Sequence, residues 1–206
     1  TQANLGILAK RGVTFIGPNE GDMACGEYGI GRMSEPLQIA VALEDFFAAT
    51  GRLAGRRALI TSGPTYEPID PVRYIANRSS GKQGHAIAGA LTRLGTKTTL
   101  VTGPTQQPDP PGVRVIHVES ARQMLKACEA ALPADIAVCA AAVADWRVDI
   151  EANQKLKKKT GARPSPLVMT ENPDILQTLS NTKNTRPGLV IGFAAETENV
   201  IANAQV

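Results

Sequence analysis

Short apolar segments alternate with helical segments from Arg57 onward, and this alternation limits the possible folds more than any other feature of the sequence. We expect five strands, at residues 57–61, 97–101, 113–117, 136–140 and 189–193. We expect helices between them, at residues 81–94, 120–131 and directly after Asn172. Apolar strands that alternate with helices are typical of a parallel sheet with both faces covered.

The sequence therefore predicts an α/β fold, a Rossmann-like and mostly parallel sheet with helices on both faces. Local signals support the helices. Ser120 and Gln123 have the spacing of a capping box, which marks a helix start. Gly95 follows an amphipathic stretch and is expected to end a helix.

The first fifty residues have a different pattern. The expected elements are the end of a helix at 2–11, a short strand at 13–16, a glycine-rich loop at 17–33 and a helix that begins after Ser34. Residues 1–50 carry a net charge of −3, and residues 51–206 carry +6. We therefore expect two domains, 1–50 and 56–206, with a linker at 51–55.

The composition excludes several classes of protein. The longest apolar run, Ile136–Ala144, is far shorter than the roughly 20 residues of a membrane span. Three cysteines without metal-ligand spacing, and two histidines, argue against a zinc site and favour a reducing, cytoplasmic location. Scattered aromatic residues argue against nucleic-acid binding. The chain begins with Thr1 and no signal peptide is visible, so we expect it to begin inside a longer protein.

Ligands of parallel sheets bind beyond the carboxyl ends of the strands, so the segments that follow the expected strands are the candidate sites. The first is a long polar loop at 62–82, which runs into a helix with Gly81 and Gly84 in its first turn. Free N–H groups at such a helix start bind anions. The loop matches neither the P-loop nor the dinucleotide fingerprint, and ordinary helix capping is an equally good interpretation.

Three other segments carry candidate groups. Small residues and then Asp145 follow the fourth expected strand, where a carboxylate can bind a ribose or Mg²⁺. Lys155 and Lys157 would share one face of an extended segment and suit phosphates. Phe193 ends the last expected strand. The alternatives are a solvated carboxylate, a solvated charged surface and core packing of the phenyl ring. Cys25 is a thiol in a glycine-rich loop that can donate a proton, and the alternative is an incidental loop cysteine.

Together these segments resemble the bifunctional phosphopantothenoylcysteine decarboxylase/phosphopantothenate–cysteine ligase family of coenzyme A biosynthesis. The ligase-like motifs come in the family's order: Gly63-Pro64-Thr65, Asp70-Pro71-Val72-Arg73-Tyr74-Ile75 with Asn77, Ser79-Ser80-Gly81-Lys82, Ala141-Ala142-Val143-Ala144-Asp145, Lys155-Leu156-Lys157-Lys158, Asn172-Pro173-Asp174-Ile175 and Gly192-Phe193-Ala194-Ala195-Glu196-Thr197. The segment from Ala24 to Met33 looks like the substrate clamp of the decarboxylase. The resemblance covers nearly the whole chain, with flavin-binding residues expected upstream and further ligase residues beyond Val206.

The resemblance implies that CTP activates the carboxylate of 4′-phosphopantothenate as an acyl-cytidylate, which the amine of cysteine then converts to an amide. Lys155 would contact the triphosphate together with Mg²⁺, whose protein ligands are not assigned. Asn77 would act on the acyl oxygen in the second step, and Ser80 with Gly81 would bind a phosphate. The nucleotide would lie against Cys139, Ala140, Ala141, Ala142, Asp145, Phe193, Ala194, Ala195 and Glu196.

The resemblance also implies an FMN-dependent decarboxylation to 4′-phosphopantetheine, with FMN bound upstream of this chain and Cys25 as the proton donor. It implies a dimer of the ligase part. Two other functions stay open. A nucleotide-dependent oxidoreductase on a Rossmann-like sheet would bind NADH, and a non-catalytic paralogue would bind a flavoprotein partner.

Overall fold

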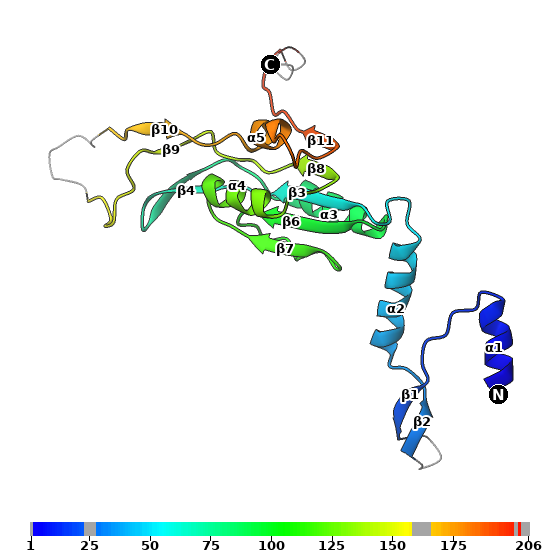
Figure 1. Ribbon diagram of the computed structural model, residues 1–206. Coiled ribbons are helices and arrows are strands. Elements are labelled where there is room, and N and C mark those ends of the chain that lie inside the picture. The colour runs from blue at the N-terminus through cyan, green and yellow to red at the C-terminus, as the bar shows by residue number, and fades with distance from the viewer. Residues whose placement is uncertain (1, 23–27, 158–165, 200–201, 203–206) are drawn as a thin grey trace. The chain divides into compact units, whose positions relative to one another are not determined.

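The computed structural model describes residues 2–22, 28–157, 166–199 and 202 (Figure 1). The chain divides into two compact units, Thr1–Thr50 and Gly51–Val206. Each unit is described by itself. Within the described residues, no helix is long and apolar enough to cross a membrane.

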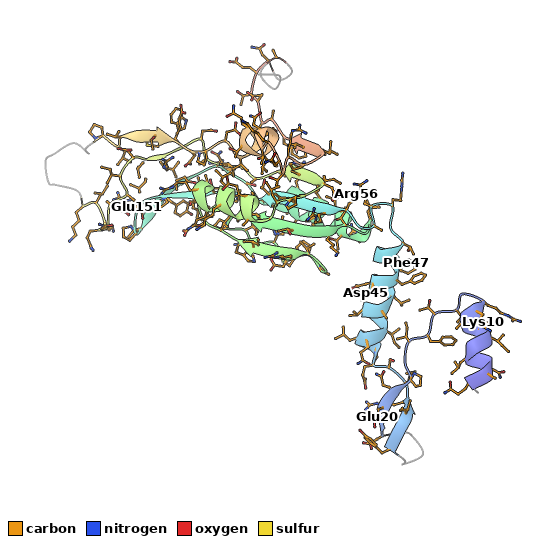
Figure 2. All side chains as sticks on the ribbon, viewed as in Figure 1. Lys10, Glu20, Asp45, Phe47, Arg56 and Glu151 are labelled. Carbon is orange, nitrogen blue, oxygen red and sulfur yellow. The ribbon has the colours of Figure 1, made fainter. Side chains whose placement is uncertain are left out.

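The first unit contains helix α1 (Gln2–Lys10), strands β1 (Asn19–Asp22) and β2 (Tyr28–Arg32), and helix α2 (Pro36–Ala49). Strands β1 and β2 pair antiparallel. The expected strand at 13–16 is wrong, because that segment has no regular structure and Phe15 is 43% exposed. The expected loop at 17–33 contains this hairpin instead, since its glycines conceal the alternation of a strand. Figure 2 shows Asp45 and Phe47 projecting from α2, where Phe47 is exposed.

The second unit is built on a five-stranded sheet with the order β11-β8-β3-β6-β7. Its strands are β3 (Arg57–Ser62), β6 (Lys97–Thr102), β7 (Arg114–His117), β8 (Ile136–Cys139) and β11 (Leu189–Gly192). Every neighbouring pair is parallel. The predicted parallel sheet is confirmed, because these strands bury apolar side chains on both faces.

Helices cover both faces of this sheet. Helix α3 (Lys82–Arg93) packs on one face over a cluster that includes Ile60 and Leu100. Helices α4 (Ala121–Ala130) and α5 (Ile175–Asn181) pack on the other face with Leu59. The capping box of α4 is confirmed, and Asp174 caps α5 by accepting a hydrogen bond from the backbone of Gln177.

Two antiparallel hairpins extend the second unit beyond the carboxyl ends of the sheet strands (Figure 1). One pairs β4 (Tyr66–Asp70) with β5 (Arg73–Ala76), and the other pairs β9 (Trp146–Val148) with β10 (Met169–Glu171). Strand β4 contacts β9, so the hairpins lie side by side. The expected loop at 62–82 is therefore wrong where β4 and β5 lie. Figure 2 shows Arg56 and Glu151 at opposite ends of this unit.

Candidate functional site

The segments that follow β3 and β8 continue side by side beyond the sheet. The N–H of Ala142 donates to the carbonyl of Gly63 at 2.8 Å, and Pro64 and Ala142 form an isolated parallel bridge. Two buried hydroxyls join the segments further. The Oγ1 atom of Thr61 accepts from the N–H of Ala141 at 3.2 Å, and that of Thr65 accepts from Ala144 at 3.0 Å.

These contacts decide what the small-residue loop after β8 can offer a ligand. Its N–H groups at Ala140, Ala141, Ala142 and Ala144 all donate to protein oxygens. The carbonyl of Ala142 accepts from the N–H of Thr65 at 3.4 Å, so the loop offers a ligand the carbonyl oxygens of Ala140 and Ala141 rather than N–H groups. Such oxygens accept hydrogen bonds from N–H donors of a ligand.

Two asparagine side chains hold the other side of the same loop. The Nδ2 atom of Asn77 donates to the carbonyl of Val143 at 2.9 Å, and that of Asn172 donates to Ala144 at 2.7 Å. The N–H of Asn172 also donates to the carbonyl of Asp145 at 2.8 Å. The structure thus brings Asn77 and the exposed residue Asp145 to one edge of the sheet.

The start of α3 lies at this edge as well. Gly81 has φ +70°, and a Cβ there would lie 2.6 Å from the methyl group of Thr105, so both conformation and space require glycine. The Oγ atom of Ser62 donates to the carbonyl of Gly81 at 2.9 Å and lies 3.0 Å from Nδ1 of His85. Gly81 makes no side-chain cap. The N–H of Lys82 donates to Oγ of Ser80 at 3.4 Å, which leaves the N–H groups of Gln83 and Gly84 in the first turn for an anion.

The lysine segment is held beside the β4–β5 hairpin. The N–H of Ala152 donates to the carbonyl of Ile69 at 3.0 Å, and the N–H of Leu156 donates to Oδ2 of Asp70 at 3.0 Å. Lys155 and Lys157 flank Leu156 and are both exposed. Their ammonium groups are therefore available to a ligand.

The segment after β11 leaves the sheet next to the loop after β8, because Gly192 pairs with Cys139. Phe193 is 50% exposed, which contradicts core packing of its ring. The three residues that follow are also exposed: Ala194, Ala195 and Glu196. Ser80, one residue before Gly81, is exposed too.

The described cysteines are not reactive thiols. Burial raises the pKa of Cys128 to about 12 and that of Cys139 to about 11, so both stay protonated at neutral pH. Cys139 therefore offers no thiolate to a site. Cys25 lies outside the described residues. Among the residues described, no group of three His, Cys, Asp or Glu side chains could hold a metal ion.

Reasoning from the sequence missed four residues that build this edge: Thr61, Thr65, Asp70 and Asn172. Thr65, Asp70 and Asn172 stand in three of the quoted motifs, so those motifs were the available signal. Thr61 carries no comparable signal, because its role depends on a segment 80 residues further along the chain.

Comparisons with known proteins agree with this architecture. The bifunctional coenzyme A biosynthesis protein CoaBC of Haemophilus influenzae is 48% identical over 201 residues, which are 97% of this chain and 50% of that protein. CoaBC of Escherichia coli is 45% identical over 202 residues, with the same coverage. The chain therefore spans about half the length of the curated relatives it matches.

Solved structures show the same fold. A crystal structure of the C-terminal domain of CoaBC is 42% identical, with a TM-score of 0.63 over 74% of this chain and 71% of that one. Cab2 in complex with phosphopantothenate-cysteine is 17% identical, with a TM-score of 0.55 over 82% and 74% of the two chains. Residues 53–206 match the family described as the DNA/pantothenate metabolism flavoprotein C-terminal domain, and the chain belongs to that family.

Proposed function

We propose that residues 51–206 form the ligase part of a bifunctional enzyme of coenzyme A biosynthesis. This part joins 4′-phosphopantothenate to cysteine and consumes CTP. The observation that carries the proposal is the meeting of Asn77, Asp145 and the uncapped start of α3 at the carboxyl edge of one parallel sheet. Ligands of such sheets bind at that edge. The similarity to CoaBC and the ligand of Cab2 support the substrate class.

The ligation needs an activated carboxylate, because oxide is a very poor leaving group at neutral pH. CTP supplies the activation when the carboxylate attacks its α-phosphorus and pyrophosphate leaves. The cytosine base carries an exocyclic amine, which is a hydrogen-bond donor. The carbonyl oxygens of Ala140 and Ala141 would accept from such a donor within the loop of residues 139–142, and exposed Phe193 to Glu196 would line the other side of the nucleotide.

The anionic groups of the substrates have matching partners. The start of α3 at Ser80 and Gly81 would bind a phosphate, and Lys155 would bind the triphosphate. Asp145 would hold the ribose or Mg²⁺. A single exposed carboxylate fits Mg²⁺, which usually keeps several waters and binds one or two carboxylates together with substrate phosphates. When bound, Mg²⁺ would neutralise phosphate charge.

Asn77 would act in the second step. One N–H of its amide donates to the carbonyl of Val143, which fixes the orientation of the side chain. The second N–H would donate to the acyl oxygen of the cytidylate as negative charge develops there. The amine of cysteine would then displace CMP and form the amide bond.

The first unit would belong to the FMN-dependent decarboxylase part, which converts the ligase product to 4′-phosphopantetheine. Cys25 would donate a proton to carbon in that reaction, and FMN would bind outside this chain. We further propose that the ligase part is a dimer, as the family resemblance implies, and that the enzyme is cytoplasmic, as its cysteine content favours.

The experiment that tests this proposal is a substitution of Asn77→Asp in the full-length protein. We expect amide formation to slow by at least about a hundredfold while acyl-cytidylate accumulates, as for the loss of a donor that stabilises a transition state. Chromatography of quenched reactions with labelled CTP would measure both species. Asn184→Asp, at an exposed asparagine beyond α5, is the control and should retain normal turnover. Normal amide formation without accumulated cytidylate would refute the role of Asn77.

A further inference from the structure

Two side chains of the β4–β5 hairpin hold both backbone polar groups of Leu156. The Oδ2 atom of Asp70 accepts from the N–H of Leu156 at 3.0 Å, and a terminal nitrogen of Arg73 donates to the carbonyl of Leu156 at 2.8 Å. Asp70 and Arg73 are also joined to each other, since Nε of Arg73 donates to the same Oδ2 atom at 3.1 Å. The pair therefore acts on Leu156 as one unit, which we call the Asp70–Arg73 anchor.

The two carboxylate oxygens of Asp70 have different partners. The Oδ1 atom accepts from the N–H groups of Val72 and Arg73 within the turn, at 2.9 and 3.0 Å. The Oδ2 atom accepts a hydrogen bond from Leu156, a residue 86 positions further along the chain. The Asp70 side chain is fully buried, and the Arg73 guanidinium holds the pKa of that carboxyl well below its usual range. The carboxylate is thus a fixed anion aimed at the lysine segment.

Few other interactions hold the segment around Leu156 in place. Residues 152–157 form neither helix nor strand, and the side chain of Leu156 is 45% exposed. The second attachment is the hydrogen bond from Ala152 to Ile69, the neighbour of Asp70 in β4. Lys155 lies between Ala152 and Leu156, and Lys157 directly follows Leu156.

We propose that Asp70, braced by Arg73, is a positioning residue that places Lys155 for binding the nucleotide triphosphate. This inference rests on the proposed function, which assigns the triphosphate to Lys155. Ordering a free loop and a lysine side chain costs conformational entropy when a ligand binds. An anchor that orders the backbone before binding removes part of that cost. Its loss therefore weakens binding of the triphosphate more than it slows the later amide-forming step.

The anchor itself is tested by amide hydrogen exchange of the full-length protein, measured on peptides that cover residues 152–157. In Asp70→Asn we expect exchange there to be at least about tenfold faster than in the wild type, because the ionic acceptor of the Leu156 N–H is lost. Asp135→Asn is a matched control, since Asp135 also accepts from a backbone N–H and an arginine, Arg57 and Arg56, at the opposite edge of the sheet. Unchanged exchange in Asp70→Asn would overturn the inference.

A second variant separates the anchor from the folding of the hairpin. Leu156→Pro removes the N–H that Asp70 accepts and leaves the bonds within residues 66–76 in place. We expect native exchange at 66–76 and a weaker affinity for CTP in this variant. Normal affinity for CTP in Leu156→Pro would contradict the anchor, whatever the folding state of Asp70→Asn.

The link to Lys155 is tested by a double-mutant cycle with Lys155→Gln. Asp70→Asn should raise the KM for CTP about tenfold with a smaller change in kcat, and it should have no further effect in the Lys155→Gln background. Additive effects would show that Asp70 does not act through Lys155. If Lys155→Gln alone left the KM for CTP unchanged, the proposed role of Lys155 would fail, while the exchange result would still report on the anchor.

Discussion

Single hydroxyl groups set the shape of the loop after β8. Thr65 is fully buried, and its Oγ1 atom accepts the N–H of Ala144, the residue before Asp145. Asn172 holds the carbonyl of the same alanine from the other side. The position of Asp145 therefore depends on hydrogen bonds to its neighbour rather than on packing of its own side chain.

Replacement of Thr65 by valine should show this dependence. Thr65→Val keeps the shape of the side chain but leaves the buried N–H of Ala144 without an acceptor, which costs about 1–3 kcal/mol of unfolding free energy. We also expect weaker binding of CTP, because the loop with Asp145 loses one of its attachments. Urea unfolding and calorimetric titration with CTP would measure the two effects. Thr65→Ser keeps the hydroxyl and should restore both, and equal behaviour of the two variants would contradict the role of the hydroxyl.

At the scale of elements, the contact between α3 and β3 is close enough to discriminate between two glycines of one helix. A Cβ on Gly84 would lie 2.5 Å from Cβ and 3.0 Å from Cα of Ser62. A Cβ on Gly89 would lie 3.4 Å from the end of the flexible Arg93 side chain and 3.7 Å from Pro110. Only Gly84 therefore allows the helix to approach the strand that leads into the site.

Alanine at these two positions should have opposite effects. Gly84→Ala forces α3 away from β3 and should lower the free energy of unfolding by about 1–3 kcal/mol, as overpacking does. Gly89→Ala meets only ordinary contacts and should raise it by about 0.5–1 kcal/mol through helix propensity. Urea midpoints of the two variants would test this difference. A stable Gly84→Ala variant would mean that the helix start tolerates displacement.

The elements also differ in how far the sequence predicts them. Strand β8 lies at Ile136–Cys139, close to the expected strand at 136–140. It could be predicted because a strand that is buried on both faces is apolar at every position. Strand β4 escaped prediction because it reverses that rule: Glu67 and Asp70 are buried carboxylates, and Pro68 lies between them. Oε1 of Glu67 accepts from the N–H of Ala121, and Oδ2 of Asp70 accepts from that of Leu156, both far away along the chain. Within the described residues, the buried Oε2 atom of Glu67 has no hydrogen-bond partner.

The residues of the candidate site also differ in how far the sequence predicts them. Asp145 and Gly81 could be named because each lies next to a predictable element at the carboxyl edge, and Asn77 was named through the family resemblance. Asn172 and the Asp70–Arg73 anchor could not be assigned positions near them, since their bonds join segments 28 and 86 residues apart. Periodicity along a chain describes burial of a face, whereas a hydrogen bond between two loops depends on the completed fold.

At the scale of the whole molecule, the boundary between the units lies before Gly51 rather than within the turn that follows it. A Cβ on Gly51 would lie 2.2 Å from the carbonyl oxygen of Leu94, and the N–H of Leu53 donates to that oxygen at 2.8 Å. Arg56 is bonded to Asp135 at 3.1 Å. Residues 51–56 are thus part of the second unit, and Leu53 links them to the end of α3 through its bond to Leu94.

A protease site inserted at two neighbouring places should therefore have different consequences. Cleavage of the full-length protein between Thr50 and Gly51 should leave the melting temperature of the second unit and its ligase activity unchanged. The same insertion between Leu53 and Ala54 separates the residue that bonds to Leu94 from strand β3. We expect it to lower the melting temperature even before cleavage, by about 2–4 °C for each kcal/mol of unfolding free energy that is lost. Scanning calorimetry and the ligase assay would measure both. If cleavage after Thr50 abolished ligation, the second unit would depend on the first, and the two activities would not be separable at this boundary.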